Sequence, residues 1–197
     1  MRCGYTRRQG LLFCMPEKKA RELMENVVIC GAARTPIGGF QGVFDAVPAA
    51  RLGGAAIEAA LQQTSLSSVD EVVMGNVLGA GQGQAPARQA SFYAGLGAQV
   101  PATTLNKMCG SGMKATMIGF DQIALGQTQV MAVGGMESMS NAPYLLPKMR
   151  GGARLGHSQV ADHMFLDGLE DAYDEGKLMG SFAEDTAEHY QFTKIKA

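Results

Sequence analysis

The sequence predicts an α/β fold in which a mainly parallel mixed sheet is covered by helices. Two observations support this class. Several short apolar runs end in small residues, as in strands buried on both faces. These runs alternate along the chain with amphipathic helical patterns. Such alternation favours right-handed crossovers between parallel strands, and helices must then cover both faces of the sheet.

The first half of the alternating pattern begins at Val27. VVICGAAR and EVVMGNVL are continuous apolar runs, which predict buried strands. PAARLGGAAIEAALQQ and PARQASFYAGL each begin with a proline, which suits the first turn of a helix. The expected elements are a strand, a helix, a strand and a short helix, over 27–34, 48–63, 71–78 and 86–96.

The second half of the pattern surrounds the stretch TTLNKMCGSGMKA. TTLNKM starts with β-branched residues and predicts a strand over 103–108, and VMAVGGM predicts a buried strand over 130–136. GSGMKATMIGFDQIALG predicts a helix over 110–126 between them. Few of its positions are charged, so we expect a mostly buried helix with an apolar face along Met113, Met117, Phe120 and Ala124.

The character of the sequence changes after Met139. The remaining residues are rich in turns, charges and aromatic side chains, which predicts a less regular insertion or small subdomain. We therefore expect a leader or upstream extension at 1–24, an α/β domain at 25–139 and an irregular region at 140–197. The apolar run near the start is too short for a signal peptide.

Composition limits the classes of partner. The chain has 197 residues, 46% of them hydrophobic and 18% charged, which suits a globular protein of one domain, or of one domain plus an excursion. A net charge of −1 argues against nucleic acid as the main partner, because such binding needs a strong basic field. No apolar run is long enough to span a membrane, so we expect no membrane partner.

The cysteine pattern argues against metal and disulfides. Cys3, Cys14, Cys30 and Cys109 form no CxxC pair, and no histidine lies near them at metal-ligand spacing. So few cysteines in a chain of this length also argue against a disulfide framework. A reducing compartment fits this pattern, and we expect a cytoplasmic location.

Cys109 lies where a predicted strand ends and a predicted helix begins. Free N–H groups and the positive end of the helix dipole favour thiolate over thiol there, which makes the sulfur nucleophilic. Gly110 and Gly112 remove side chains beside it, and nearby N–H groups could hold a developing oxyanion. A packed structural cysteine is the alternative. The coincidence of strand end, helix start and glycines favours the nucleophile.

A thiol nucleophile needs a base, and the sequence offers no convincing one. The three histidines, His157, His163 and His189, all lie in the irregular region without a motif around them. We interpret each as a surface or packing residue.

These stretches resemble the thiolase superfamily. LNKMCGSGMKA looks like the nucleophile motif, and VICGAARTPIGGFQG, MGNVLGAGQGQAPARQA and AVGGMESMSNAPY match in order and spacing. RGGARLGH, DGLEDAY and KLMGSFAEDTAE continue the match from about residue 25 to 192. NKMCGSG is more similar to acetyl-CoA C-acetyltransferases (acetoacetyl-CoA thiolases) than to long-chain thiolases or ketoacyl synthases.

The resemblance implies a layered thiolase fold and an acyltransferase of fatty acid metabolism. Cys109 would be acetylated by acetyl-CoA or acetoacetyl-CoA. The enolate of a second acetyl-CoA would then attack the acetyl-cysteine, in a reversible Claisen condensation that gives acetoacetyl-CoA and CoA. Coenzyme A thioesters are the substrates, and no permanently bound cofactor is implied. The family's catalytic histidine and second cysteine lie in a C-terminal half, so we expect this chain to be an incomplete N-terminal half.

The resemblance also assigns supporting and binding residues. Region 140–197 would be part of the loop domain that holds coenzyme A. Lys148, Arg150 and Arg154 would lie near its phosphates, although a solvated loop face is an equal alternative. Glu137 would support the active-site loop, and Gly110 would serve the oxyanion or the loop.

Two positions depart from the family pattern. Many members have a His-Met pair beside the pantetheine where this chain has Leu178 and Met179, so Leu178 puts that contact in doubt. An Asn is common before PARQ, where this chain has Ala85.

Two other functions remain as alternatives. A non-catalytic thiolase-fold fragment would bind coenzyme A or pair with another chain, and a ketoacyl-synthase-like condensing enzyme is the weaker possibility. The resemblance implies a homodimer or homotetramer for the intact protein.

Overall fold

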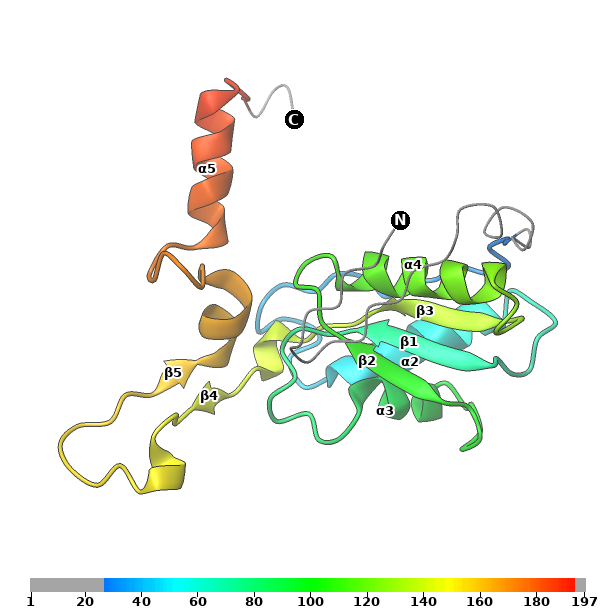
Figure 1. Cartoon of the computed structure of the whole chain (residues 1–197), viewed down its shortest axis with the longest axis horizontal. Coiled ribbons are helices and arrows are strands. Elements are labelled where there is room, and N and C mark those ends of the chain that lie inside the picture. Colours follow the sequence, from blue (N-terminus) through cyan, green and yellow to red (C-terminus); the bar gives the residue numbers. More distant parts are fainter. Residues whose placement is uncertain (1–26, 194–197) are drawn as a thin grey trace, which may run out of the picture.

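A three-stranded parallel sheet lies at the centre of the computed structural model, which describes residues 27–193. The predicted leader at 1–24 lies outside the described residues. The strand order is β2-β1-β3, with β1 at Glu71–Gly75, β2 at Ala102–Leu105 and β3 at Met131–Gly135 (Figure 1). The central strand carries Val72, Val73 and Met74, which are almost completely buried. Its continuous apolar run is therefore explained by burial on both faces.

Helices cover both faces of the sheet, which confirms the predicted α/β class. Figure 1 shows α4 (Ser111–Ala124) on one face, with α2 (Ala49–Leu61) and α3 (Pro86–Tyr93) on the other. Parallel neighbours need such crossovers, and α3 joins β1 to β2 while α4 joins β2 to β3. The main core lies between the sheet and α2 and α3, and includes Ala50, Ile57, Val72, Met74, Ala87, Ala90 and Met136.

The expected first strand, over 27–34, is wrong for the described structure. This segment joins no sheet, and the side chains of Val28 and Ile29 are 73% and 85% exposed. Its backbone bonds to a side chain instead: Ala32 N–H donates to Gln63 Oε1, and Gln63 Nε2 donates to the Ala32 carbonyl. Without a neighbouring strand and cover on both faces, the apolar run forms no ladder.

The expected packing face of α4 is confirmed only at Ala124, and the expectation of a mostly buried helix is wrong. Met113, Met117 and Phe120 are exposed, and the buried residues are Ser111, Ala115, Gly119 and Ala124. A Cβ at Gly119 would lie 2.7 Å from Val133 Cγ1, so the helix approaches β3 through its small residues. Periodicity identified an apolar face, but close packing on the sheet selected a face of small residues that shares only Ala124 with it.

Short elements follow the sheet, in the part of the chain predicted to be irregular. Strand β4 (Tyr144–Leu145) pairs antiparallel with β5 (Ala161–Asp162). Three short helical segments, η1, η2 and η3, cover Met139–Asn141, Met149–Gly151 and Phe165–Leu169. Helix α5 (Met179–His189) extends away from the sheet in Figure 1 and has no buried residue. The domain boundary at residue 139 remains a prediction.

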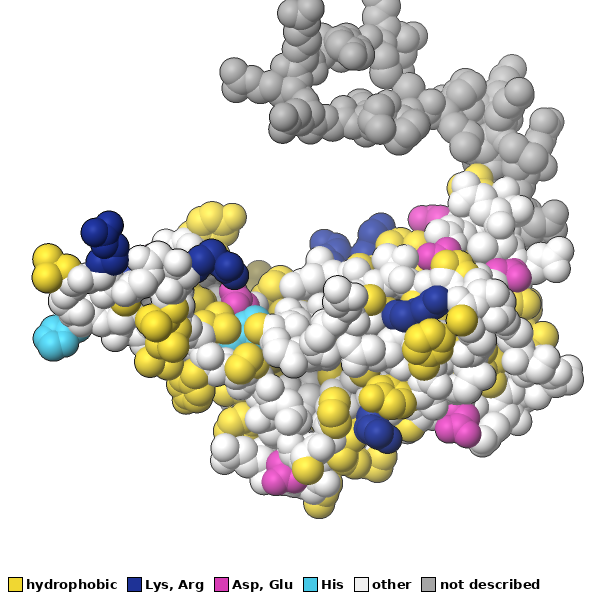
Figure 2. Space-filling view, turned by 90° about the horizontal axis from the view of Figure 1, so that it is seen from below, with side chains coloured by type: hydrophobic (Ala, Val, Ile, Leu, Met, Phe, Trp, Pro, Cys, Tyr) yellow, Lys and Arg dark blue, Asp and Glu magenta, His cyan; other side chains and the backbone are white. Residues whose placement is uncertain are grey.

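On the face shown in Figure 2, the charged side chains are not gathered in one region. Figure 2 shows hydrophobic side chains spread over the visible face, with Lys and Arg side chains scattered between them. Within residues 27–193, no helix has the length and apolar character needed to cross a bilayer.

Candidate active site

The carboxyl ends of the three parallel strands meet at one edge of the sheet. Gly75 of β1 pairs with Leu105 of β2 and with Gly135 of β3, so the residues that follow each strand emerge side by side. These following residues include Asn76, Cys109 and Glu137. Such an edge is where parallel α/β sheets bind ligands.

A pocket of about 440 Å³ lies at this edge and contains Cys109. Its lining is mostly apolar, and four of the lining residues are glycines. The lining consists of Gly75, Asn76, Val77, Leu78, Met108, Cys109, Ser111, Gly112, Gly135, Met136, Glu137, Met139, Gly168 and Leu169. Cys109 is exposed. An exposed thiol in a pocket favours the nucleophile over the packed structural cysteine.

A tight turn between β2 and α4 holds Cys109 in place. The carboxamide oxygen of Asn106 accepts a hydrogen bond from Met108 N–H at 2.8 Å. The hydroxyl of Ser111 accepts from Lys107 N–H at 2.8 Å and donates to the Met108 carbonyl at 2.6 Å. Met108 has φ 48°, a left-handed conformation that costs a side-chain-bearing residue about 1–2 kcal/mol. The surrounding hydrogen bonds therefore hold the backbone immediately before the thiol in this strained conformation.

Gly75 lets the start of α4 sit directly on the end of β1. A Cβ at this position would lie 2.5 Å from Ser111 Cβ and 2.8 Å from Gly112 N. No larger residue fits at this position unless the helix start moves. Gly75 therefore allows the start of α4, and with it Cys109, to lie close to the end of β1. The predicted strand over 71–78 ends at Gly75 because the next residues turn to line the pocket.

The Glu137 carboxylate binds the loop that follows β1. It accepts hydrogen bonds from Asn76 Nδ2 at 2.7 Å, Val77 N–H at 2.8 Å and Leu78 N–H at 3.1 Å. Burial raises the pKa of Glu137 above its ordinary value of 4.5, although the backbone N–H bonds from Val77 and Leu78 act in the opposite direction. This geometry suits the loop-supporting role that was predicted for Glu137.

The other predicted site residues lie elsewhere. Gly110 N–H donates to the Lys107 carbonyl at 3.1 Å, so it closes the turn before α4, and its oxyanion role remains a prediction. Lys148, Arg150 and Arg154 are on or beside η2, beyond β4. Leu178 and Met179 begin α5. None of these five lines the Cys109 pocket.

Sequence reasoning missed three polar residues that support the pocket. Asn76, Ser111 and His163 are all buried. Asn76 is the one amide in the apolar run EVVMGNVL, which was a usable signal. The i, i+4 pair of His163 and Asp167 was a signal for His163. His157 and His189 are exposed, as expected for surface residues.

A comparison with protein families identifies the family of this chain. Residues 27–196 match the family described as "Thiolase, N-terminal domain". The chain belongs to this family. The match covers the pocket and the whole described structure.

Acetyl-CoA acetyltransferases are among the relatives of this thiolase-family chain. The acetyl-CoA acetyltransferase of Pseudomonas aeruginosa is 50% identical over 173 residues, which are 87% of this chain and 44% of that protein. Acetyl-CoA acetyltransferase 2 of Arabidopsis thaliana is 51% identical over 86% of this chain and 42% of its own length. The mitochondrial acetyl-CoA acetyltransferase A of Xenopus laevis is 46% identical, over 89% and 41%. The chain therefore spans less than half the length of these relatives.

The arrangement around Cys109 suits acyl transfer in a thiolase-family protein. An accessible thiol at a helix start, in a pocket walled by small and apolar residues, can attack a thioester carbonyl. Among the described residues, no histidine lines this pocket. No group of three or more His, Cys, Asp or Glu within residues 27–193 is placed to hold a metal ion.

Proposed function

We propose that this chain carries the acyl-accepting half of an acetyl-CoA C-acetyltransferase, with Cys109 as the catalytic residue. The observation that supports it most directly is the exposed Cys109 thiol in an apolar pocket at the carboxyl edge of the sheet. Three relatives at 46–51% identity carry the name acetyl-CoA acetyltransferase.

The proposed step is a thiol–thioester exchange. The Cys109 sulfur, as thiolate, attacks the carbonyl carbon of acetyl-CoA and forms a new C–S bond. The bond from that carbon to the CoA sulfur then breaks, and CoA leaves as the thiolate, which takes up the proton that Cys109 released. In the complete reaction, the enolate of a second acetyl-CoA attacks the acetyl-cysteine, which gives acetoacetyl-CoA and restores Cys109.

The second step needs groups that we place outside the described residues. The thiolase resemblance puts a catalytic histidine and a second cysteine in a C-terminal half. We therefore expect Cys109 acetylation, but little or no thiolase turnover, from the 197-residue chain alone.

Coenzyme A thioesters are the proposed substrates, without a resident cofactor. Lys148, Arg150 and Arg154 are proposed to meet CoA phosphates, with Leu178 and Met179 beside the pantetheine. All five lie away from the pocket lining, so this binding mode requires the thioester to reach from Cys109 to η2 and α5. A homodimer or homotetramer and a cytoplasmic location complete the proposal, and light scattering and cell fractionation test them.

Acetyl incorporation tests the acyltransferase function. The purified chain is incubated with radiolabelled acetyl-CoA, quenched in acid and mapped by peptide mass spectrometry. We expect label on Cys109 that hydroxylamine removes, as for a thioester, and no such label in Cys109→Ser. Cys30→Ser is the matched control, because Cys30 is also exposed and does not line the pocket.

The alternative function predicts a different result from the same samples. A non-catalytic thiolase-fold fragment would bind CoA in calorimetry but leave Cys109 unlabelled. The exposed apolar face of α4, with Met113, Met117 and Phe120, is the observation that favours pairing with another chain under that alternative.

A further inference from the structure

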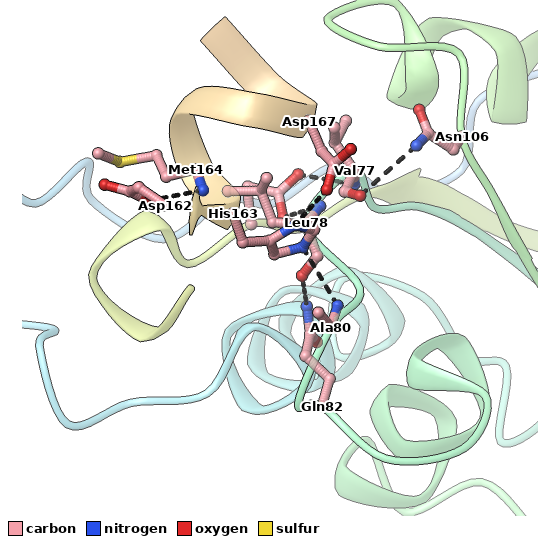
Figure 3. Close-up of polar contacts among 10 residues, drawn as sticks. Val77, Leu78, Ala80, Gln82, Asn106, Asp162, His163, Met164 and Asp167 are labelled. Atoms are coloured by element: carbon pink, nitrogen blue, oxygen red, sulfur yellow. Dashed lines mark hydrogen bonds and ion pairs between the residues drawn. The ribbon is translucent and has the colours of Figure 1, made fainter. Parts of the chain in front are cut away.

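His163 is a buried ionisable side chain that the proposed chemistry does not use. It lies between β5 and η3 and is only 5% exposed. Its Nδ1 is 2.6 Å from Asp167 Oδ2, and its Nε2 accepts a hydrogen bond from Ala80 N–H at 3.2 Å (Figure 3). Both ring nitrogens of this histidine are therefore engaged, one on each side of the ring.

The two contacts determine the tautomer of His163. A backbone N–H can only donate, so Nε2 must present its lone pair to Ala80. The ring proton therefore resides on Nδ1 and is donated to the Asp167 carboxylate. His163 therefore bonds to Asp167, four residues further along the chain, and to Ala80, 83 residues away in the sequence.

The segments that contain Ala80 and Asp167 form facing parts of the Cys109 pocket. The loop after β1 supplies Val77 and Leu78, and η3 supplies Gly168 and Leu169. They approach closely, because a Cβ at Gly168 would lie 3.2 Å from Leu78 Cδ2. Glu137 and Asn106 hold the same loop at Val77 and Leu78, and His163 adds an attachment further along the loop, at Ala80.

We propose that His163 is a positioning residue of the thiol pocket, which ties the η3 wall to the loop after β1 and so limits the size of the group that reaches the Cys109 sulfur. The identity of that group as a short acyl chain rests on the proposed function. The tie itself rests only on the Ala80–His163–Asp167 geometry.

Four variants separate the two halves of the tie. In His163→Asn, the amide nitrogen takes the place of Nδ1 and can donate to Asp167, but nothing reaches Ala80. In His163→Gln, the amide oxygen can accept from Ala80, but the donor to Asp167 is lost. His163→Phe removes both bonds and keeps the ring volume, and Asp167→Asn weakens only the Asp167 side. His157→Phe, at an exposed histidine of the same region, is the matched control.

Thiol labelling with a small and a bulky reagent measures how large a group can reach the Cys109 sulfur, and it requires no acetyl transfer. The full chain and its variants are reacted separately with iodoacetamide and with pyrene maleimide, and the rates at Cys109 and Cys30 are read from peptides. Cys30 is exposed and outside the pocket, so it serves as the internal reference in every sample. Circular dichroism verifies that each variant is folded.

The expected result is a loss of size selection at Cys109. The ratio of the pyrene maleimide rate to the iodoacetamide rate at Cys109 is divided by the same ratio at Cys30. This normalised ratio should rise at least about fivefold in His163→Phe, which is the size of effect expected when a buried hydrogen bond is lost. The single-bond variants His163→Asn, His163→Gln and Asp167→Asn should be intermediate, and His157→Phe unchanged. Long-range ¹⁵N–¹H spectra of the wild-type chain should show the His163 proton on Nδ1.

An unchanged ratio in folded His163→Phe, or a ring proton on Nε2, would overturn the proposal. If His163→Phe does not fold, unchanged ratios in the three single-bond variants overturn it equally. Acetyl labelling by acetyl-CoA distinguishes the two proposals. A raised ratio with no acetyl-cysteine would reject the proposed function and keep His163 as a positioning residue.

Discussion

Glu137 and Asn76 are joined by a 2.7 Å hydrogen bond across the carboxyl edge of the sheet, although they follow different strands. Asn76 also donates to the Met136 carbonyl at 3.2 Å and accepts from Gln82 Nε2 at 3.0 Å. This pair connects the ends of β1 and β3 beside the Cys109 pocket.

We expect the Glu137–Asn76 pair to be energetically coupled. Glu137→Ala leaves the Val77 and Leu78 N–H groups without their acceptor and removes one of the two acceptors of Asn76 Nδ2, so it should lower the free energy of unfolding by about 1–3 kcal/mol. Asn76→Ala should cost a similar amount, and the double variant less than the sum. Urea denaturation measures all three, with Glu58→Ala on an exposed face of α2 as the control. Strict additivity would show that the hydrogen bond carries no coupling.

Glu137 also predicts a pH dependence of stability. Because burial raises its pKa in the folded chain above 4.5, the folded state keeps this proton to a higher pH than the unfolded state does. Its contribution is complete below about pH 4.5 and declines as the pH rises through the folded-state pKa. We subtract the free energy of unfolding of Glu137→Gln from that of wild type. This difference should be more positive at about pH 4 than at about pH 7, because only wild type loses stability as Glu137 ionises. Urea titrations across this range measure it, and a difference that grows with pH would contradict the assignment.

Gly75→Ala should displace the start of α4. The new Cβ would lie within 2.5–2.8 Å of Ser111 and Gly112 atoms, and overpacking of this kind costs about 1–3 kcal/mol. Gly134→Ala is the matched control in β3, because its Cβ meets only Met74 at the ordinary distance of 3.5 Å. Denaturant midpoints and the Cys109 alkylation rate should change for Gly75→Ala alone. Equal effects of the two variants would show that helix placement does not depend on Gly75.

Ala85→Asn should stabilise the chain. Ala85 precedes α3 with φ 48°, and Asn tolerates this left-handed region better than Ala does. This backbone gives a physical reason for the Asn that is common at the corresponding family position. We expect a gain of about 0.5–1 kcal/mol, and a loss in Ala85→Val, whose β-branched side chain is strained there. Thermal unfolding measures both, and a destabilised Ala85→Asn would show that φ is not the deciding factor.

Arg150 and Arg154 should contribute to coenzyme A affinity if the proposed binding mode holds. The double variant Arg150→Gln/Arg154→Gln removes two cations and should weaken CoA binding by about three- to tenfold, with less effect on dephospho-CoA. Calorimetry measures both dissociation constants. Arg51→Gln, whose guanidinium stacks on Tyr93, is the control on another face. Unchanged affinity in the double variant would favour the solvated loop face.

Local patterns were sufficient for most of the α/β domain. The helices over 48–63, 86–96 and 110–126 and the strands over 71–78, 103–108 and 130–136 all form, each shorter than its predicted range at one or both ends. Their order also placed Cys109 at a strand end and a helix start. Strand and helix periodicities, proline positions and junction chemistry are properties of neighbouring residues, so they can be predicted from the sequence.

Tertiary packing decided which surfaces meet. The small residues of α4 face the sheet and its methionines face outward, because the distance to Val133 leaves no room for a side chain at Gly119. The apolar segment at 27–34 forms no ladder without a neighbouring strand. The links from Glu137 to Asn76 and from His163 to Ala80 join residues 61 and 83 positions apart. Such partners are selected by three-dimensional distance and by the need to satisfy buried polar groups, and neither is contained in a local pattern.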